Sequence, residues 1–160
     1  MKIGFVCCPP VQGHFNPLSA LARQLQLRNH EVVMFSTPAT EPLVRAANLP
    51  SVSFGAKEFP VEKMSEIVAF LGRLKGGEAL EYTTAALATM TEVQWKQLPD
   101  LLVSTGVDAL VLDNSNFYGE VIPMRLEMPY AILSNALYFD YSGYTPTCVY
   151  GWGHEIRLKP

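Results

Sequence analysis

The sequence predicts an α/β domain built on a doubly wound, mostly parallel sheet. Four short apolar runs lie at residues 3–8, 31–36, 108–112 and 130–134. They lack strict alternation of apolar and polar residues, which is typical of strands covered by helices on both faces. Helical patterns separate the runs, and alternation of strands with helices favours right-handed crossovers in one sheet. In the commonest order of such a sheet, the fourth strand lies beside the first.

The first helical pattern follows the first strand directly. Asn16 is a suitable N-cap and Pro17 a suitable first helical residue, so we expect the helix to begin there. We expect it to end near Asn29, because asparagine often adopts the left-handed conformation that follows a helix.

The remaining elements are predicted in chain order. The third helix has Met64, Ile67, Val68 and Leu71 at core-facing spacing. Pro99 is expected at the end or at a kink of the fourth helix. The expected elements are a helix at 41–47, a fifth, weaker strand at 51–55, a helix around residues 64–71, a break at Gly76-Gly77, a long helix at 78–98 and a helix at 117–127 that contains Pro123.

Length and composition fit one folded domain spanning residues 1–160. The chain is 49% hydrophobic and 17% charged, which is typical of a globular protein. Its net charge of −3 gives no electrostatic basis for binding nucleic acid or an anionic membrane. No apolar run approaches the roughly 20 residues of a spanning helix, and Pro9 and Pro10 interrupt the N-terminal run. We therefore expect a cytoplasmic protein without a transmembrane segment.

Cysteines and aromatic residues give two further expectations. Cys7, Cys8 and Cys148 form neither a disulfide framework nor a zinc-binding spacing, so we interpret them as structural thiols and expect no metal. Residues 130–152 are rich in tyrosine and tryptophan, and aromatic side chains at this density need burial or a ligand.

The strongest candidate site joins His14 and Asp113. His14 lies where the first helix begins, and the positive end of a helix favours a neutral imidazole, which is a base. Asp113 directly follows the fourth strand, and neighbouring strands are about 4.8 Å apart, so we expect both side chains to reach one crevice. A carboxylate there would fix the histidine tautomer and stabilise the imidazolium. The alternatives are a surface or capping role for His14 and a helix-capping role for Asp113.

Nucleotide binding at the first loop is disfavoured. A dinucleotide fingerprint needs several glycines after the first strand, so that the backbone can approach the diphosphate. Residues 8–14 contain one glycine and two prolines, and no Walker sequence is present.

Several segments together resemble the N-terminal half of family 1 glycosyltransferases, the GT-B enzymes that include UDP-glucosyltransferases and bacterial macrolide and carotenoid glycosyltransferases. The resemblance extends to about Trp152, and it departs from the family at Asn29, where glycine is usual. The segments are Gly13-His14, Pro17-Leu18, Leu21-Ala22, Leu25, Arg28, His30-Glu31-Val32 and Phe35, followed by residues 107–113 and Met128-Pro129-Tyr130.

The resemblance implies that this Rossmann-like domain binds the acceptor of an inverting, metal-independent sugar transfer. His14 would be the general base and Asp113 its orienting partner. The acceptor would be a small, hydroxylated, apolar molecule, and the candidate residues around it are Gly13, Phe70, Leu87, Met90, Asn114, Phe117, Ser134 and Tyr138. Core packing is the alternative for each of the wall residues, above all Leu87 and Met90.

The resemblance also implies that a second domain, at the C-terminal side, binds the nucleotide-sugar donor, expected to be a UDP-sugar. A whole enzyme needs roughly two such domains. We therefore expect the chain to be a truncated hexosyltransferase, without a cofactor of its own and inactive alone. Two alternatives remain: a natural half-enzyme that pairs with a separate donor-binding subunit, and a flavodoxin-like protein that binds nucleotides directly.

Overall fold

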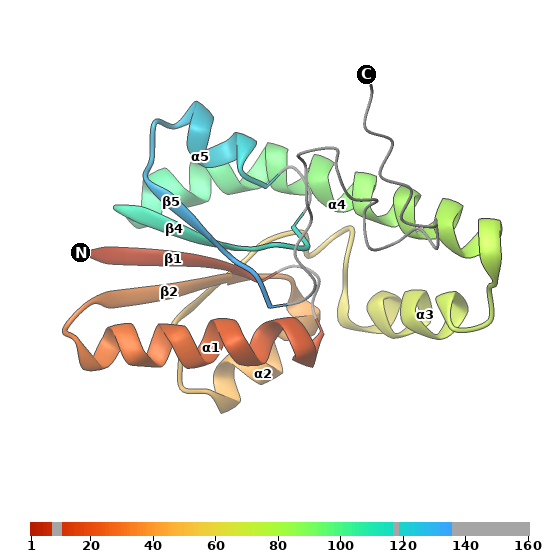
Figure 1. Ribbon diagram of the computed structural model, residues 1–160, viewed down its shortest axis with the longest axis horizontal. Coiled ribbons are helices and arrows are strands. Elements are labelled where there is room, and N and C mark those ends of the chain that lie inside the picture. The colour runs from red at the N-terminus through yellow and green to blue at the C-terminus, as the bar shows by residue number, and fades with distance from the viewer. Residues whose placement is uncertain (8–10, 117–118, 136–160) are drawn as a thin grey trace, which may run out of the picture.

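The structure is a computed structural model that describes residues 1–7, 11–116 and 119–135. Its centre is a five-stranded sheet in the order β3-β2-β1-β4-β5, in which every neighbouring pair is parallel (Figure 1). The strands are β1 (Lys2–Cys7), β2 (Glu31–Ser36), β3 (Ser51–Ser53), β4 (Ala109–Asp113) and β5 (Tyr130–Leu133). The predicted fold class and the pairing of the first and fourth strands are confirmed.

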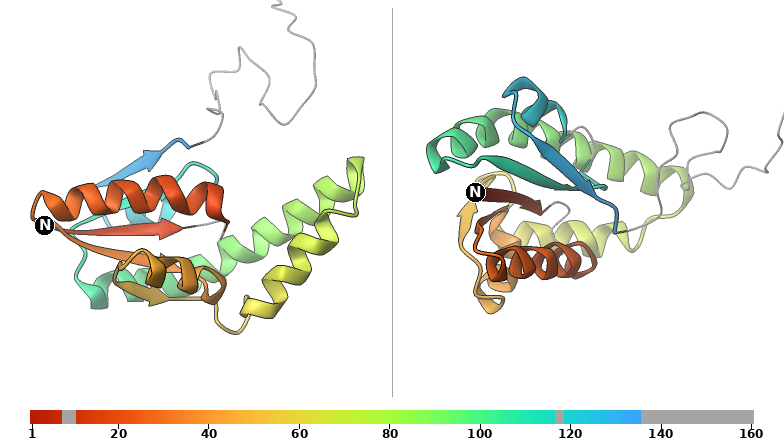
Figure 2. Two further views of the ribbon diagram at one scale, coloured as in Figure 1. Left: turned by 90° about the horizontal axis from the view of Figure 1, so that it is seen from below. Right: turned by 60° about the vertical axis from the view of Figure 1, so that its left-hand side comes forward.

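Helices cover the sheet on two faces (Figures 1 and 2). On one face, α1 and α2 pack against β1 and β2, and on the other, α4 and α5 pack over the centre of the sheet. The helices are α1 (Gln12–Leu27), the 3-10 helix η1 (Pro38–Thr40), α2 (Glu41–Ala46), α3 (Val61–Leu71), α4 (Gly76–Thr105) and α5 (Val121–Arg125). No helix in the described part of the chain is long and apolar enough to cross a membrane.

Strand β1 is buried on both sides, which explains its continuous apolar sequence. Phe5 and Cys7 belong to the core beneath α1, whereas Val6 belongs to the core beneath α4. Gly4 is required by space: a Cβ atom there would lie 2.9 Å from Leu110 Cδ1 and 3.0 Å from Phe35 Cε2. A strand crowded on both faces is fixed in register, so the position of its carboxyl end is well defined.

Helix α1 begins earlier than the sequence predicts. It starts at Gln12 after Val11, so Asn16 is not its N-cap and Pro17 lies inside it. The extra turn buries Phe15, which is 4% exposed, and Pro17 removes a single backbone bond, to the carbonyl of Gly13. The predicted end is confirmed, because Asn29 has φ 63° and its N–H bonds to the Gln26 carbonyl at 3.0 Å.

Helix α4 continues past its predicted end. Pro99 lies inside it, and the helix ends at Gly106, which has φ 68°. Leu98 and Leu102, on either side of the proline, are 1% and 0% exposed. Burial of this apolar stripe against the sheet therefore outweighs the bond that Pro99 removes.

Two other helices also differ from the prediction. No residue of α3 is buried, and Val68 is 53% exposed, so its predicted core position is wrong, although Met64 and Ile67 do pack against the core. Helix α5 is shorter than predicted and accommodates Pro123 at its third residue, where the backbone N–H would have no helical partner. Of the predicted span, residues 117 and 118 lie outside the described residues, as does the aromatic segment beyond residue 135.

An arm extends beyond the carboxyl ends of the strands (Figures 1 and 2). It consists of α3 and residues 76–89 of α4, and we call it the α3–α4 arm. The buried residues of α4 all lie at or after Met90, so the arm contains none of them.

Candidate functional site

His14 is held by the first turn of α1. It is the third residue of the helix, and its backbone N–H donates to the Val11 carbonyl at 3.1 Å. Its side chain is 20% exposed, so one edge of the ring is accessible while the other faces the protein. The exposed fraction suits a base, because a substrate must reach the ring.

Asp113 is the last residue of β4 and is 1% exposed. Both of its carboxylate oxygens lie 3.0 Å from Nδ1 of His14. An ionised carboxylate only accepts hydrogen bonds, so it requires a proton on Nδ1, and in the neutral ring Nε2 then has the free lone pair. The predicted meeting of the two side chains is confirmed, and its geometry leaves Nε2 as the basic nitrogen.

Asp113 accepts two further hydrogen bonds. The backbone N–H of Ser115 donates to Oδ1 at 2.7 Å, and the side-chain amide of Asn135 donates to Oδ2. Three donors around a buried carboxylate compensate for its lost hydration. The helix-capping interpretation of Asp113 is wrong, because the N-cap of α5 is Glu120.

Asn135 was missed by the sequence analysis. It lies just beyond β5, and the pairing of β4 with β5 places Asp113 opposite Leu133, two residues earlier. The signal that could have found it is a polar residue just past the carboxyl end of the strand next to β4.

Cys7 lies at the end of β1, close to the pair. Burial, with a smaller effect from the charge of Asp113, raises the pKa of Cys7 to about 12. Its thiol is therefore neutral near pH 7 and adds no charge beside His14 and Asp113. The interpretation of Cys7 as a structural thiol is confirmed, whereas Cys8 and Cys148 lie outside the described residues.

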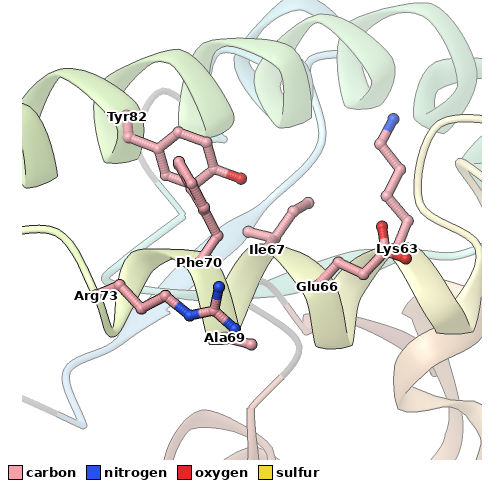
Figure 3. Close-up of a pocket in the computed structure, with 7 residues that line it drawn as sticks. All are labelled: Lys63, Glu66, Ile67, Ala69, Phe70, Arg73 and Tyr82. Atoms are coloured by element: carbon pink, nitrogen blue, oxygen red, sulfur yellow. The ribbon is translucent and has the colours of Figure 1, made fainter.

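A pocket of about 450 Å³ lies in the α3–α4 arm (Figure 3). Phe70 of α3 and Tyr82 of α4 meet edge to face, with ring centroids 4.9 Å apart. The other lining residues are Lys63, Glu66, Ile67, Ala69 and Arg73, which lie on α3 or just after it. The pocket does not include His14 or Asp113, but both it and the pair lie at the carboxyl ends of the strands. The lining therefore combines aromatic and aliphatic side chains with charged ones.

The other predicted acceptor residues differ in their surroundings. Gly13 is exposed, and no described atom lies within 4 Å of a Cβ built there. Met90 is 6% exposed within the core, so core packing accounts for it, and Leu87 is half-buried. Asn114 donates to Ser134 Oγ at 3.4 Å beside the pair, and Phe117 and Tyr138 lie outside the described residues.

No cluster of three or more histidine, cysteine, aspartate or glutamate side chains that could hold a metal ion occurs within residues 1–7, 11–116 and 119–135. The chain is a doubly wound α/β domain with a histidine–carboxylate pair between the carboxyl ends of β1 and β4. In this class of domain, ligands generally bind at the carboxyl ends of the strands.

Comparison with curated protein sequences finds two similar glycosyltransferases. The chain is 28% identical over 132 residues to zeaxanthin glucosyltransferase from Pseudescherichia vulneris, covering 82% of this chain and 30% of that protein. It is 22% identical over 129 residues to zeaxanthin glucosyltransferase from Pantoea ananas, covering 81% and 30%. The chain thus spans about 30% of the length of the curated relatives it matches. No protein-family model matches it.

Comparison with solved structures also finds glycosyltransferases. Spinosyn rhamnosyltransferase SpnG matches with a TM-score of 0.60 at 18% identity, over 82% of this chain and 34% of that one. The glycosyltransferase SsfS6 of Streptomyces sp. SF2575 matches with 0.63 at 19%, over 82% and 38%. SnogD of Streptomyces nogalater matches with 0.63 at 19%, over 83% and 34%. The resemblance is confirmed: the chain has the fold of GT-B glycosyltransferases and is similar in sequence to zeaxanthin glucosyltransferases.

Proposed function

We propose that the chain is the acceptor-binding part of an inverting glycosyltransferase, in which His14 is the general base and Asp113 its orienting partner. The observation that carries the proposal is the contact of His14 Nδ1 with both oxygens of a buried Asp113 at the carboxyl ends of β1 and β4. The likeness to glycosyltransferases in sequence and fold supports it.

The proposed reaction is a single displacement. Nε2 of His14 takes the proton of an acceptor hydroxyl while that oxygen forms a bond to the anomeric carbon of the sugar. The bond from this carbon to the nucleotide diphosphate breaks at the opposite face, and the nucleotide leaves with the electron pair. The configuration of the carbon is therefore inverted. The Asp113 carboxylate stabilises the imidazolium that forms, as in other histidine–carboxylate pairs.

The proposed acceptor is a hydroxylated, largely apolar small molecule. The Phe70–Tyr82 pocket supports an apolar acceptor, because aromatic side chains offer large apolar contact surfaces. Two relatives are named for transfer to zeaxanthin, and SpnG has been solved with a spinosyn aglycone. Gly13 would allow close approach of the acceptor to His14, since its position is open.

The proposed donor is a nucleotide sugar held by a second domain. SpnG and SsfS6 were solved with thymidine diphosphate, so dTDP-sugars stand beside the expected UDP-sugars as candidates. The chain spans 30–38% of the length of the proteins that it matches. We propose that the 160-residue chain is inactive alone and acts with a donor-binding domain, in the same polypeptide or in a partner subunit.

The test is a transfer assay with UDP-glucose or a dTDP-sugar and zeaxanthin as the acceptor probe. The chain is assayed alone and joined to or mixed with the donor-binding part. Product is expected only when the donor-binding part is present. Transfer by the 160-residue chain alone would refute the half-enzyme proposal.

The role of His14 is tested in the active assembly. His14→Ala should reduce kcat by about 10²–10⁴, the usual cost of losing a general base. The matched control is His30→Gln, because His30 lies just before β2, at the amino end of the strands and away from the pair. Turnover near that of the unmodified protein in His14→Ala would remove His14 from the mechanism.

The flavodoxin-like alternative makes a different prediction. It requires the chain alone to bind UDP or NAD tightly, which calorimetry can measure. The segment before α1 lacks the glycines that such binding uses, so we expect no tight binding.

A further inference from the structure

The side chain of Asn135 is oriented by Asp113. Its Nδ2 donates to Oδ2 of the carboxylate. Because a carboxylate has no proton to give, only the NH₂ group of the amide can face it, so the chemistry fixes which way round the amide lies. Asn135 lies just after β5. The site therefore takes side chains from three places in the fold: the start of α1, the end of β4 and the segment after β5.

The carboxylate of Asp113 is held on both of its outer sides. Ser115 N–H donates to Oδ1 at 2.7 Å and Asn135 to Oδ2, while His14 Nδ1 lies 3.0 Å from each oxygen. The imidazole therefore faces the middle of the carboxylate. Loss of either outer donor would let the carboxylate turn and would leave more of its charge uncompensated.

The balance of charge at this pair matters for a base. A buried carboxylate beside an imidazole favours the protonated ring, and a protonated ring cannot accept a proton from a substrate. Each donor to Asp113 that is not His14 takes up part of the negative charge and so weakens this effect.

We propose that Asn135 is a positioning residue of the site, which holds the Asp113 carboxylate toward His14 and shares its negative charge. This inference rests on the proposed function, because only a histidine that accepts a proton in each cycle needs such a balance.

The other titratable groups on the elements around α1 are poorly placed to set this balance. Helix α1 packs against β1, β2 and α2. Cys7 of β1 is a neutral thiol, and Glu41 and Arg45 of α2 pair with each other at 2.7 Å. Lys2 and Glu31 lie at the opposite, amino ends of β1 and β2. Asp113 is therefore the charge that Asn135 must share.

The experiment follows the His14 ring by NMR as the pH is varied, in the 160-residue chain without donor or acceptor. The variants are Asn135→Ala, which removes the donor and most of the side chain, and Asn135→Leu, which removes the donor and nearly keeps the size of the side chain. The control is Ile132→Ala, since Ile132 lies on β5 and is 52% exposed. A His14→Gln variant identifies the resonance.

The midpoint of the His14 titration should move to higher pH in both Asn135 variants, because an Asp113 carboxylate that has lost a donor keeps more negative charge to stabilise the imidazolium. It should not move in the control. In the active assembly, the acidic limb of the pH–rate profile should move in the same direction. A purely structural role for Asn135 would lower thermal stability without moving either midpoint.

Two outcomes would overturn the inference: an unchanged midpoint in folded Asn135→Leu, or a lower midpoint in either variant. If Asn135→Ala does not melt cooperatively, Asn135→Leu, which nearly keeps the size of the side chain, decides the question. The titration needs no sugar donor, so it is independent of the transfer assay. Full turnover of His14→Ala would refute the proposed function and leave the titration result standing, whereas an unchanged titration would refute the role of Asn135 alone.

Discussion

Gly13→Ala tests whether glycine at this position is required for folding or for binding of the acceptor. Gly13 is the second residue of α1, directly before His14, and a Cβ atom built there meets no described atom within 4 Å. Its φ is not in the left-handed region. Within the described part of the chain, neither space nor backbone conformation therefore requires glycine at this position. Alanine in a helix is favoured over glycine by about 0.5–1 kcal/mol, so the substitution should leave stability unchanged or raise it.

Gly77→Ala is a matched control for this change. Gly77 is also the second residue of its helix, α4, is exposed, and has no described atom within 4 Å of a Cβ placed at that position. Gly76 is unsuitable because its φ is 55°. Both substitutions should raise the melting temperature by at most about 4 °C, since 1 kcal/mol corresponds to roughly 2–4 °C in a domain of this size.

The two variants should differ in function. If the acceptor passes over Gly13 to reach His14, the added methyl group should lower kcat/KM by about 10–200-fold, the usual effect of one misplaced methylene in a binding site. Gly77→Ala should transfer sugar at the rate of the unmodified protein. Equal transfer by the two variants would show that the acceptor does not approach Gly13. A large loss of stability in Gly13→Ala alone would refute the open geometry itself.

Four other substitutions and reactions test separate parts of the molecule. Gly4→Ala should destabilise the domain by about 1–3 kcal/mol in thermal or denaturant unfolding, because its methyl group would overlap Leu110 and Phe35; an unchanged stability would contradict the crowding at β1. Asp113→Asn should lower kcat by up to about 10⁴ with a smaller effect on KM, because an amide does not stabilise the imidazolium as a carboxylate does. With its pKa raised from 9.0 to about 12, Cys7 should react with iodoacetamide at pH 8 about 10³-fold more slowly than in the unfolded chain, and stability from this group should be present below pH 9 and lost as the pH rises toward 12. Phe70→Ala should change the preference among apolar acceptors in competition assays while the His14 titration stays the same, since Phe70 lines the arm pocket and does not contact the pair.

The central strands were predictable because β1, β2 and β4 are buried, whereas β5, which was also expected to be covered on both faces, is largely exposed. A continuous apolar run leaves little choice of element, and the commonest strand order of doubly wound sheets then places β4 beside β1. This is why the meeting of His14 with Asp113 followed from the sequence. The limits of the helices were less predictable. Pro17 alone indicates the start of a helix and Pro99 alone indicates an end or a kink, but both lie inside helices, where Phe15 and Leu102 are buried.

Asn135 was missed for a different reason. Its contact with Asp113 depends on the register of β4 and β5, and the partner of Asp113 in that ladder is Leu133. A shift of one residue would point Asn135 to the other face of the sheet. The core position predicted for Val68 failed because helical periodicity alone does not reveal that α3 stands out from the sheet.

The residues proposed to transfer the proton and the residues proposed to select the acceptor lie in different parts of the fold. His14, Asp113 and Asn135 are fixed by a helix start and by the ends of two paired strands, and these elements belong to the sheet or pack on it. The pocket, by contrast, lies in the α3–α4 arm, whose residues contribute no buried side chain. Apart from Met64 and Ile67, which pack against the core, substitutions in the arm should therefore cost little stability, whereas substitutions around Asp113 disturb a buried, hydrogen-bonded carboxylate. If both proposals hold, substitutions in the arm pocket can change which acceptors bind, while His14, Asp113 and Asn135 keep their arrangement.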